Sequence, residues 1–193
     1  MGLVHKAFVA TALFTFLLGT AVATALPRRA PVVKLPSIIP AELIIPVEGV
    51  TSTQLVDTWG QARSEGRKHE GIDIMAPQGT PVRATAAGRI AKLFWSKRGG
   101  TTVYQFDQSG RLVYYYAHLS AYAQGLKEGD EVRQGQLIAY VGSTGNATTP
   151  HLHFEIQRAN AGHQWWRGAS LNPYMPLKTA HLPPEMATVA AIQ

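Results

Sequence analysis

Short β-rich runs separated by turn-forming residues fill the middle of this sequence, and this spacing constrains the fold more than any other feature. Residues of high β propensity recur between Val47 and Ile156 in brief stretches bounded by Gly, Pro, Asp and Ser, a pattern typical of an all-β domain. The turn Asp107–Gly110 separates two of these runs and predicts a hairpin. Helical periodicity is weak, and Leu119–Gly125 is the stretch most compatible with a helix. The expected strands are Gly71–Met75, Pro81–Ala84, Arg89–Trp95, Thr101–Asp107, Leu112–Ala117, Gln136–Val141 and Leu152–Gln157.

The first 25 residues have the features of an export signal peptide. Lys6 is basic, residues 7–22 carry no charge, and residues 21–25 hold two small-x-small cleavage sites, AVA and ATA. The alternative is an uncleaved membrane anchor, because residues 7–26 approach the ~20 residues that span a bilayer. We expect cleavage, and hence an exported protein of the periplasm, the cell envelope or the medium, without a stable membrane partner after cleavage.

Proline content marks the limits of the expected domain. Residues 26–46 include five prolines, which favours an extended linker over a packed element. The sequence becomes Pro-rich again after Asn172 and ends in small residues. We therefore expect a signal peptide at 1–25, a linker at 26–46, one domain at 47–180 and a flexible tail at 181–193.

The absence of cysteine narrows the available chemistry. It excludes disulfides, thiolate nucleophiles, cysteine-based zinc sites and the lipidated cysteine of a lipoprotein. Any metal must then be held by His, Asp or Glu, and any nucleophile must be a hydroxyl, a carboxylate or a water. The formal charge of +6 suits an anionic partner such as nucleic acid or cell wall, and equally suits simple solubility. The export signal argues against nucleic acid.

Two groups of ionisable residues have the spacing of a metal site. His69 and Asp73 are four positions apart, and the alternation of Asp73 with isoleucines places its carboxylate opposite their apolar side chains. His151 and His153 share one face of an expected strand, while the residues between and after them face the core. Two imidazoles side by side on a pleated face indicate a bound ligand, although a pair of solvated histidines is the alternative.

These residues satisfy the rule for catalytic zinc, which takes three protein ligands and one open position. His69, Asp73 and either His151 or His153 supply the ligands, and the remaining histidine is placed to take a proton from water. His118 ends another expected strand and is a candidate second acid/base or a donor to a tetrahedral oxyanion. Glu155 lies one pleat beyond His153 on the same face, and we expect it to support the ligands without binding metal.

The motifs together resemble one family. HEGID at 69–73, AHLS at 117–120 and HLHFE at 151–155 are similar to the motifs of the lysostaphin-type zinc metallopeptidases, which contain the LytM domain. The segments APQGTPV at 76–82 and GDEV at 129–132 are also similar to the sequences of this family. The similarity runs from about Val47 to Tyr174 in the family's order. There is no HExxH helix, so thermolysin-like zincins are not the appropriate comparison.

The resemblance implies a fold, a cofactor and a set of roles. The fold would be an antiparallel β-sheet domain with an open active-site groove, the duplicated hybrid motif of the lysostaphin/LytM type. His69, Asp73 and His153 would bind one Zn²⁺ per chain, and His118 and His151 would be the catalytic histidines. The function would be hydrolysis of peptide bonds in bacterial peptidoglycan, with stem-peptide cross-links expected as the substrate.

Two non-enzymatic interpretations compete with this one. A LytM-like regulator that binds the wall and activates another hydrolase usually lacks one or more of the five site residues, and this chain has all five. A biotinyl or lipoyl carrier would need a lysine at a tight hairpin tip, and no lysine lies between Lys127 and Lys178. We therefore expect a zinc metalloendopeptidase.

Overall fold

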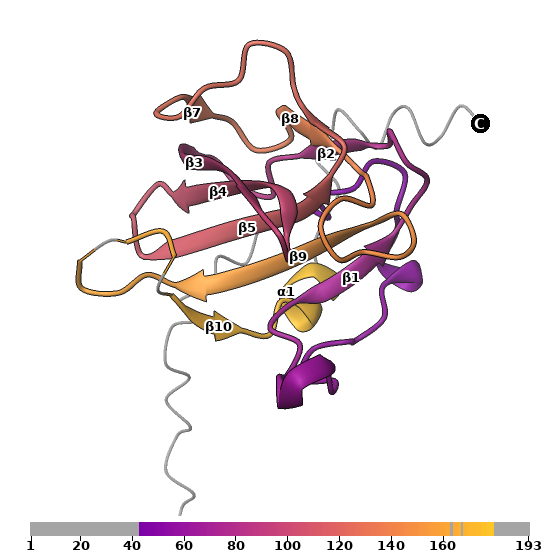
Figure 1. Ribbon diagram of the computed structural model, residues 1–193. Coiled ribbons are helices and arrows are strands. Elements are labelled where there is room, and N and C mark those ends of the chain that lie inside the picture. The colour runs from indigo at the N-terminus through magenta and orange to yellow at the C-terminus, as the bar shows by residue number, and fades with distance from the viewer. Residues whose placement is uncertain (1–42, 163, 167, 180–193) are drawn as a thin grey trace, which may run out of the picture. The chain divides into compact units, whose positions relative to one another are not determined.

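The computed structural model describes residues 43–162, 164–166 and 168–179 (Figure 1). The expected signal peptide at 1–25, most of the expected linker at 26–46 and the expected tail at 181–193 lie outside the described residues. Among the helices of the described part, none has the length and apolar character needed to cross a bilayer.

Two antiparallel β-sheets form the described domain, which confirms the expected all-β fold class. The larger sheet has seven strands in the order β1-β9-β5-β4-β3-β7, with β10 pairing with β9 beyond the end of β1 (Figure 1). The smaller sheet has three strands in the order β2-β8-β6. The strands are β1 Ile72–Met75, β2 Pro81–Arg83, β3 Gly88–Ser96, β4 Gly100–Asp107, β5 Leu112–Leu119, β6 Ala121–Tyr122, β7 Glu131–Val132, β8 Leu137–Tyr140, β9 His151–Arg158 and β10 Ala169–Leu171; the helices are η1 Ser52–Gln54, η2 Ser64–Gly66 and α1 Tyr174–Lys178.

All seven expected strands are present, with ends that differ by one or two residues. The helix considered at Leu119–Gly125 is wrong, because β6 lies there and pairs with β8. A hydrogen bond of 2.9 Å from Ala123 N to the Ile138 carbonyl continues this pairing. The partner strand lies far along the chain, so a local propensity cannot reveal it. The sequence also gave no signal for β7, β10 or α1.

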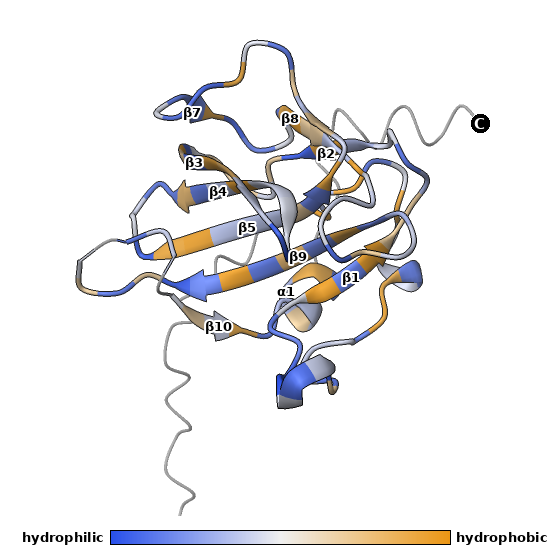
Figure 2. Ribbon diagram, viewed as in Figure 1, coloured by the Kyte–Doolittle hydropathy of each residue, from blue (hydrophilic) through white to orange (hydrophobic). Residues whose placement is uncertain are grey.

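The apolar side chains of alternate strand residues form the core. Along β9, Leu152, Phe154 and Ile156 are fully buried, and the alternation with polar residues appears in Figure 2 as blue and orange bands. Leu43 and Ile44 are also buried, and Ile44 N donates to the Thr85 carbonyl at 3.0 Å. The packed part of the chain therefore begins before residue 47, inside the segment assigned to the linker.

The register of the central strands determines which polar residues meet. Asp73 on β1 pairs with His153 on β9, and Met75 pairs with His151. On the other side of β9, Ala117 of β5 also pairs with His153. One face of the large sheet thus brings the ends of β1, β5 and β9 together.

Candidate metal centre and active site

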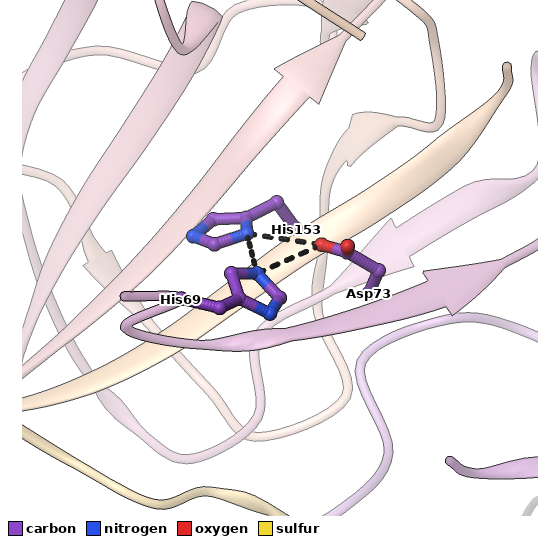
Figure 3. Close-up of side chains that lie close together, drawn as sticks. All are labelled: His69, Asp73 and His153. Atoms are coloured by element: carbon purple, nitrogen blue, oxygen red, sulfur yellow. Dashed lines mark hydrogen bonds and ion pairs between the residues drawn. The ribbon is translucent and has the colours of Figure 1, made fainter. Parts of the chain in front are cut away.

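Three ligand atoms from separate parts of the chain converge on this face. His69 Nε2 lies 2.8 Å from His153 Nδ1, and Asp73 Oδ1 lies 3.1 Å from each of these nitrogens. Figure 3 shows the two rings and the carboxylate pointing toward one another. His69 comes from the segment before β1, Asp73 from β1 and His153 from β9, so the pairing of β1 with β9 assembles the cluster.

The outer nitrogen of each ring fixes its tautomer. His69 Nδ1 lies 2.8 Å from the Thr58 carbonyl, which can only accept, so this nitrogen carries the proton. His153 Nε2 likewise donates to the Glu155 carboxylate at 2.8 Å. When both rings are neutral, the two inner nitrogens therefore carry lone pairs, which face each other and a carboxylate oxygen. Three converging acceptors require a cation between them.

The distances suit a small tetrahedral metal ion. Zinc–nitrogen and zinc–oxygen bonds of ~2.0–2.1 Å at a tetrahedral angle separate two ligand atoms by about 3.3 Å. The observed separations of 2.8–3.1 Å approach that value. The alternative occupant is a proton: burial lowers the pKa of His153, but bonds with Asp73 and Glu155 outweigh burial and raise it to about 9. The residues present therefore fit a zinc ion, and two imidazoles with one carboxylate match its preferred ligands.

Arg63 holds the second oxygen of the carboxylate. Its guanidinium lies 2.6 Å from Asp73 Oδ2, which leaves Oδ1 for the cluster. Burial raises the pKa of Asp73, but hydrogen bonds with His153 and His69 outweigh burial and hold the pKa well below its ordinary value. Asp73 is thus a permanent anion with one oxygen directed at the metal position.

The two other histidines lie beside the cluster. His151 Nε2 is 3.6 Å from Asp73 Oδ1, and the His118 ring centroid is 4.8 Å from that of His151 and 5.8 Å from that of His153. His151 Nδ1 donates to the Thr149 carbonyl and His118 Nδ1 to the Thr144 carbonyl, both at 2.8 Å. In the neutral form of each ring, Nε2 is therefore the nitrogen without a proton, and it is the atom that can accept one.

The backbone of His118 adopts a conformation that few residues other than glycine tolerate. Its φ is +62°, in the left-handed region where a Cβ crowds the backbone. The β4–β5 register shifts between Thr101 and Val103, beside this residue. His118 N donates to the Gly99 carbonyl at 2.8 Å, so neighbouring loops hold the strained residue in place. Burial lowers the pKa of His118 to about 4, which keeps the ring neutral near pH 7.

A cleft of about 430 Å³ contains all five residues that the sequence predicted. Tyr115 also lines it, with its ring edge toward His153 at 5.9 Å between centroids. Tyr114 and Tyr116 are buried on the opposite face, as strand alternation predicts. Burial raises the pKa of Tyr115 above its ordinary value, so its hydroxyl stays protonated.

Sequence reasoning missed the groups that orient the histidines. The acceptors on Thr58, Thr144 and Thr149 are backbone carbonyls, and residue identity carries no signal for them. Arg63, which binds Asp73 at 2.6 Å, was not among the predicted site residues. Its position ten residues before Asp73 gave no indication, because only the fold of the segment before β1 brings the two together.

Known proteins are similar to this chain in sequence. The model of Peptidase family M23 matches residues 67–173. The L-Ala–D-Glu endopeptidase of Bacillus subtilis (strain 168) is 37% identical over 130 residues, which cover 63% of this chain and 38% of that protein. DD-carboxypeptidase/endopeptidase Mpg of Neisseria meningitidis serogroup B (strain ATCC BAA-335 / MC58) is 49% identical over 92 residues, covering 47% and 20%. The similarity thus spans less than half of the length of either relative.

A solved structure has the same fold. The catalytic domain of the antimicrobial peptidase lysostaphin from Staphylococcus simulans superposes with a TM-score of 0.55 and 33% sequence identity. The match covers 64% of this chain and 90% of that domain. The described domain therefore corresponds to nearly the whole of a catalytic domain.

Proposed function

Because this chain belongs to Peptidase family M23, whose model matches residues 67–173, we propose that it hydrolyses peptide bonds in bacterial peptidoglycan as a zinc-dependent endopeptidase. The observation that carries the proposal is the convergence of three metal-binding atoms, within 4.8 Å of one another, beside two further histidines that line the same cleft. Relatives named as an L-Ala–D-Glu endopeptidase and a DD-carboxypeptidase/endopeptidase support a peptidoglycan substrate. We propose one zinc ion per chain and the cross-links of stem peptides as the bonds cut.

His69, Asp73 and His153 would hold the zinc ion. A zinc ion bound there supplies a Lewis acid that polarises a carbonyl and lowers the pKa of water. Asp73 contributes a negative charge, because hydrogen bonds with His153 and His69 hold its pKa well below the ordinary value. Glu155 fixes the ring of His153 through a bond of 2.8 Å.

His118 and His151 would accept a proton from water and return it to the leaving group. Both rings line the cleft and bind a backbone carbonyl through Nδ1, so Nε2 of a neutral ring can accept the proton that water releases when its oxygen attacks the scissile carbonyl carbon. The C–N bond then breaks, and the same proton passes to the leaving amine, which balances the reaction. A protonated imidazole also donates a hydrogen bond to the tetrahedral oxyanion. The pKa of His118 near 4 favours rapid return of the proton.

A non-catalytic regulator is the second candidate, and the site does not favour it. Loss of catalysis requires loss of a ligand or of a proton acceptor, and the cleft contains all five residues in converging positions. We further propose that the chain works outside the cytoplasm, because its expected substrate lies there.

The test uses purified protein from residue 26 onward. It should contain close to one zinc per chain by mass spectrometry of metals and should digest purified peptidoglycan. Asp73→Ala should lose both zinc and activity, whereas His118→Asn should keep zinc and lose turnover. Full activity of a chelator-treated, metal-free preparation contradicts the proposal. Mass spectrometry of the released muropeptides identifies the bond, and products cut only in glycine bridges contradict the stem-peptide assignment.

A further inference from the structure

The tip of the β3–β4 hairpin places an arginine in the wall of the cleft. Arg98 is exposed and lines the same cleft as His118, His151 and Tyr115. Its charge opposes the rise that burial causes in the pKa of Tyr115, so the guanidinium lies within electrostatic range of the site. Among the residues that the structure describes, none forms a hydrogen bond or ion pair with the Arg98 side chain.

The backbone that carries Arg98 is fixed to the loop that orients His118. The Arg98 carbonyl accepts a hydrogen bond of 3.0 Å from Asn146 N, and Thr101 N donates to Thr144 Oγ1 at 3.0 Å. A Cβ at Gly100 or Gly145 would overlap with the opposite backbone, which shows how closely the two segments pack. The Thr144 carbonyl also orients the His118 ring. The loop at residues 144–146 therefore holds both the backbone of Arg98 and the ring of His118.

Two other cations of the cleft already have acidic partners. Arg63 binds Asp73 at 2.6 Å, and Arg67 lies 3.6 Å from Glu65. Lys68 also lines the wall of the cleft that precedes β1, and its side chain has no acidic partner among the described residues. Arg98 lies on the tip of the β3–β4 hairpin, far along the chain from the segment before β1. It also has no acidic partner among the described residues. Arg98 is thus a cation of the cleft that remains available to an anion.

We propose that Arg98 binds a carboxylate of the substrate peptide beside the scissile bond, and so selects acidic stem peptides over uncharged bridges. Stem peptides carry free carboxylates, whereas a bridge of glycines has none along its length. A guanidinium matches a carboxylate through two parallel N–H···O bonds. The inference rests on the proposed function, since it names the substrate class of the same cleft.

The experiment compares two cross-linked stem-peptide dimers that differ only in the carboxylates beside the scissile bond, free in one and amidated in the other. We expect the zinc-loaded chain to cut the free acid with a kcat/KM about tenfold higher, the effect of one charge-assisted hydrogen bond at an exposed position. Arg98→Gln should reduce this ratio to about one through a higher KM for the acid. Arg98→Lys should keep part of the preference, because lysine retains the charge but not the fork.

Lys97→Gln is the matched control, because it removes the same charge from the adjacent exposed residue, which does not line the cleft. It should leave the ratio unchanged. Equal loss of activity on both dimers in Arg98→Gln refutes carboxylate binding, and so does an unchanged preference. If the zinc-loaded wild-type chain cuts neither dimer, the proposed function fails, and this inference fails with it. If it cuts both equally, only the role of Arg98 is refuted.

Discussion

Glu155 is the residue whose substitution should weaken the metal centre without removing a ligand. Its side chain is buried, with an exposed fraction of 7%. It accepts hydrogen bonds from His153 Nε2 at 2.8 Å and from Gln157 at 2.6 Å. Burial raises the pKa of Glu155, but the bond with His153 outweighs burial and lowers it, so the carboxylate is ionised. Glu155→Gln keeps the size and one acceptor oxygen but removes the charge.

The expected magnitude follows from the type of hydrogen bond. A bond to a charged group contributes ~1.5–3 kcal/mol and a neutral one ~0.5–1.5 kcal/mol. The substitution therefore removes about 1.4 kcal/mol from zinc binding, which is about a tenfold loss of affinity. Glu155→Ala leaves the His153 N–H without its acceptor, and we expect a loss near 100-fold, the upper end for groups that support metal ligands.

Zinc affinity can be measured by competition with a chromophoric chelator at fixed pH. Gln157→Ala is the control, because it removes the other partner of Glu155 and leaves the bond to His153 intact; it should change the affinity less than threefold. Thermal unfolding of the metal-free variants checks that each still folds. An affinity of Glu155→Gln within twofold of the wild type would refute the argument that the buried charge strengthens His153 as a ligand.

Three further predictions follow from the same geometry. Zinc uptake near pH 7 should release about one proton, because the pKa of His153 without metal is about 9 and a proton therefore occupies the cluster below pH 9. Zinc affinity should fall as pH falls, and calorimetry in buffers of different ionisation enthalpy measures the number of protons released. His118→Asn should retain the fold, because Asn tolerates positive φ, and should lower kcat about 10²–10⁴-fold in a peptidoglycan digestion assay; a loss below tenfold contradicts the role. Gly100→Ala should destabilise the domain by about 1–3 kcal/mol in urea unfolding, because its φ is +66° and a Cβ would meet Thr144; unchanged stability contradicts the tight packing.

The sequence was sufficient for seven of the ten strands in the described residues and for the residue types of the site. Alternation in His151–Arg158 separated polar from apolar side chains, because successive residues of a strand face opposite sides. It therefore predicted a buried Leu152 and Phe154 and an imidazole pair on one face. The spacing of His69 and Asp73 and the lack of cysteine limited the choice of metal ligands. These inferences needed only local geometry and the chemistry of the side chains.

The elements that the sequence missed depend on distant partners. β6 forms because β8 lies beside it, although the local sequence was compatible with a helix. β10 is a short strand of three residues that pairs with β9. Leu43, in the segment expected to be a linker, is buried in the core. In each case the pairing or burial that stabilises the segment comes from residues far along the chain, so a local pattern could not predict it.

By itself, the sequence determined that this chain forms an antiparallel β domain with histidines and a carboxylate able to hold a metal. Only the tertiary structure decided which nitrogen of each ring faces the cluster, since backbone carbonyls of Thr58, Thr144 and Thr149 accept the outer protons. It also decided that Arg63 binds Asp73 and that Arg98 lines the cleft without an acidic partner among the described residues. The physical reason is that the direction of a lone pair and the pairing of charges depend on distances between segments, which the order of residues does not specify.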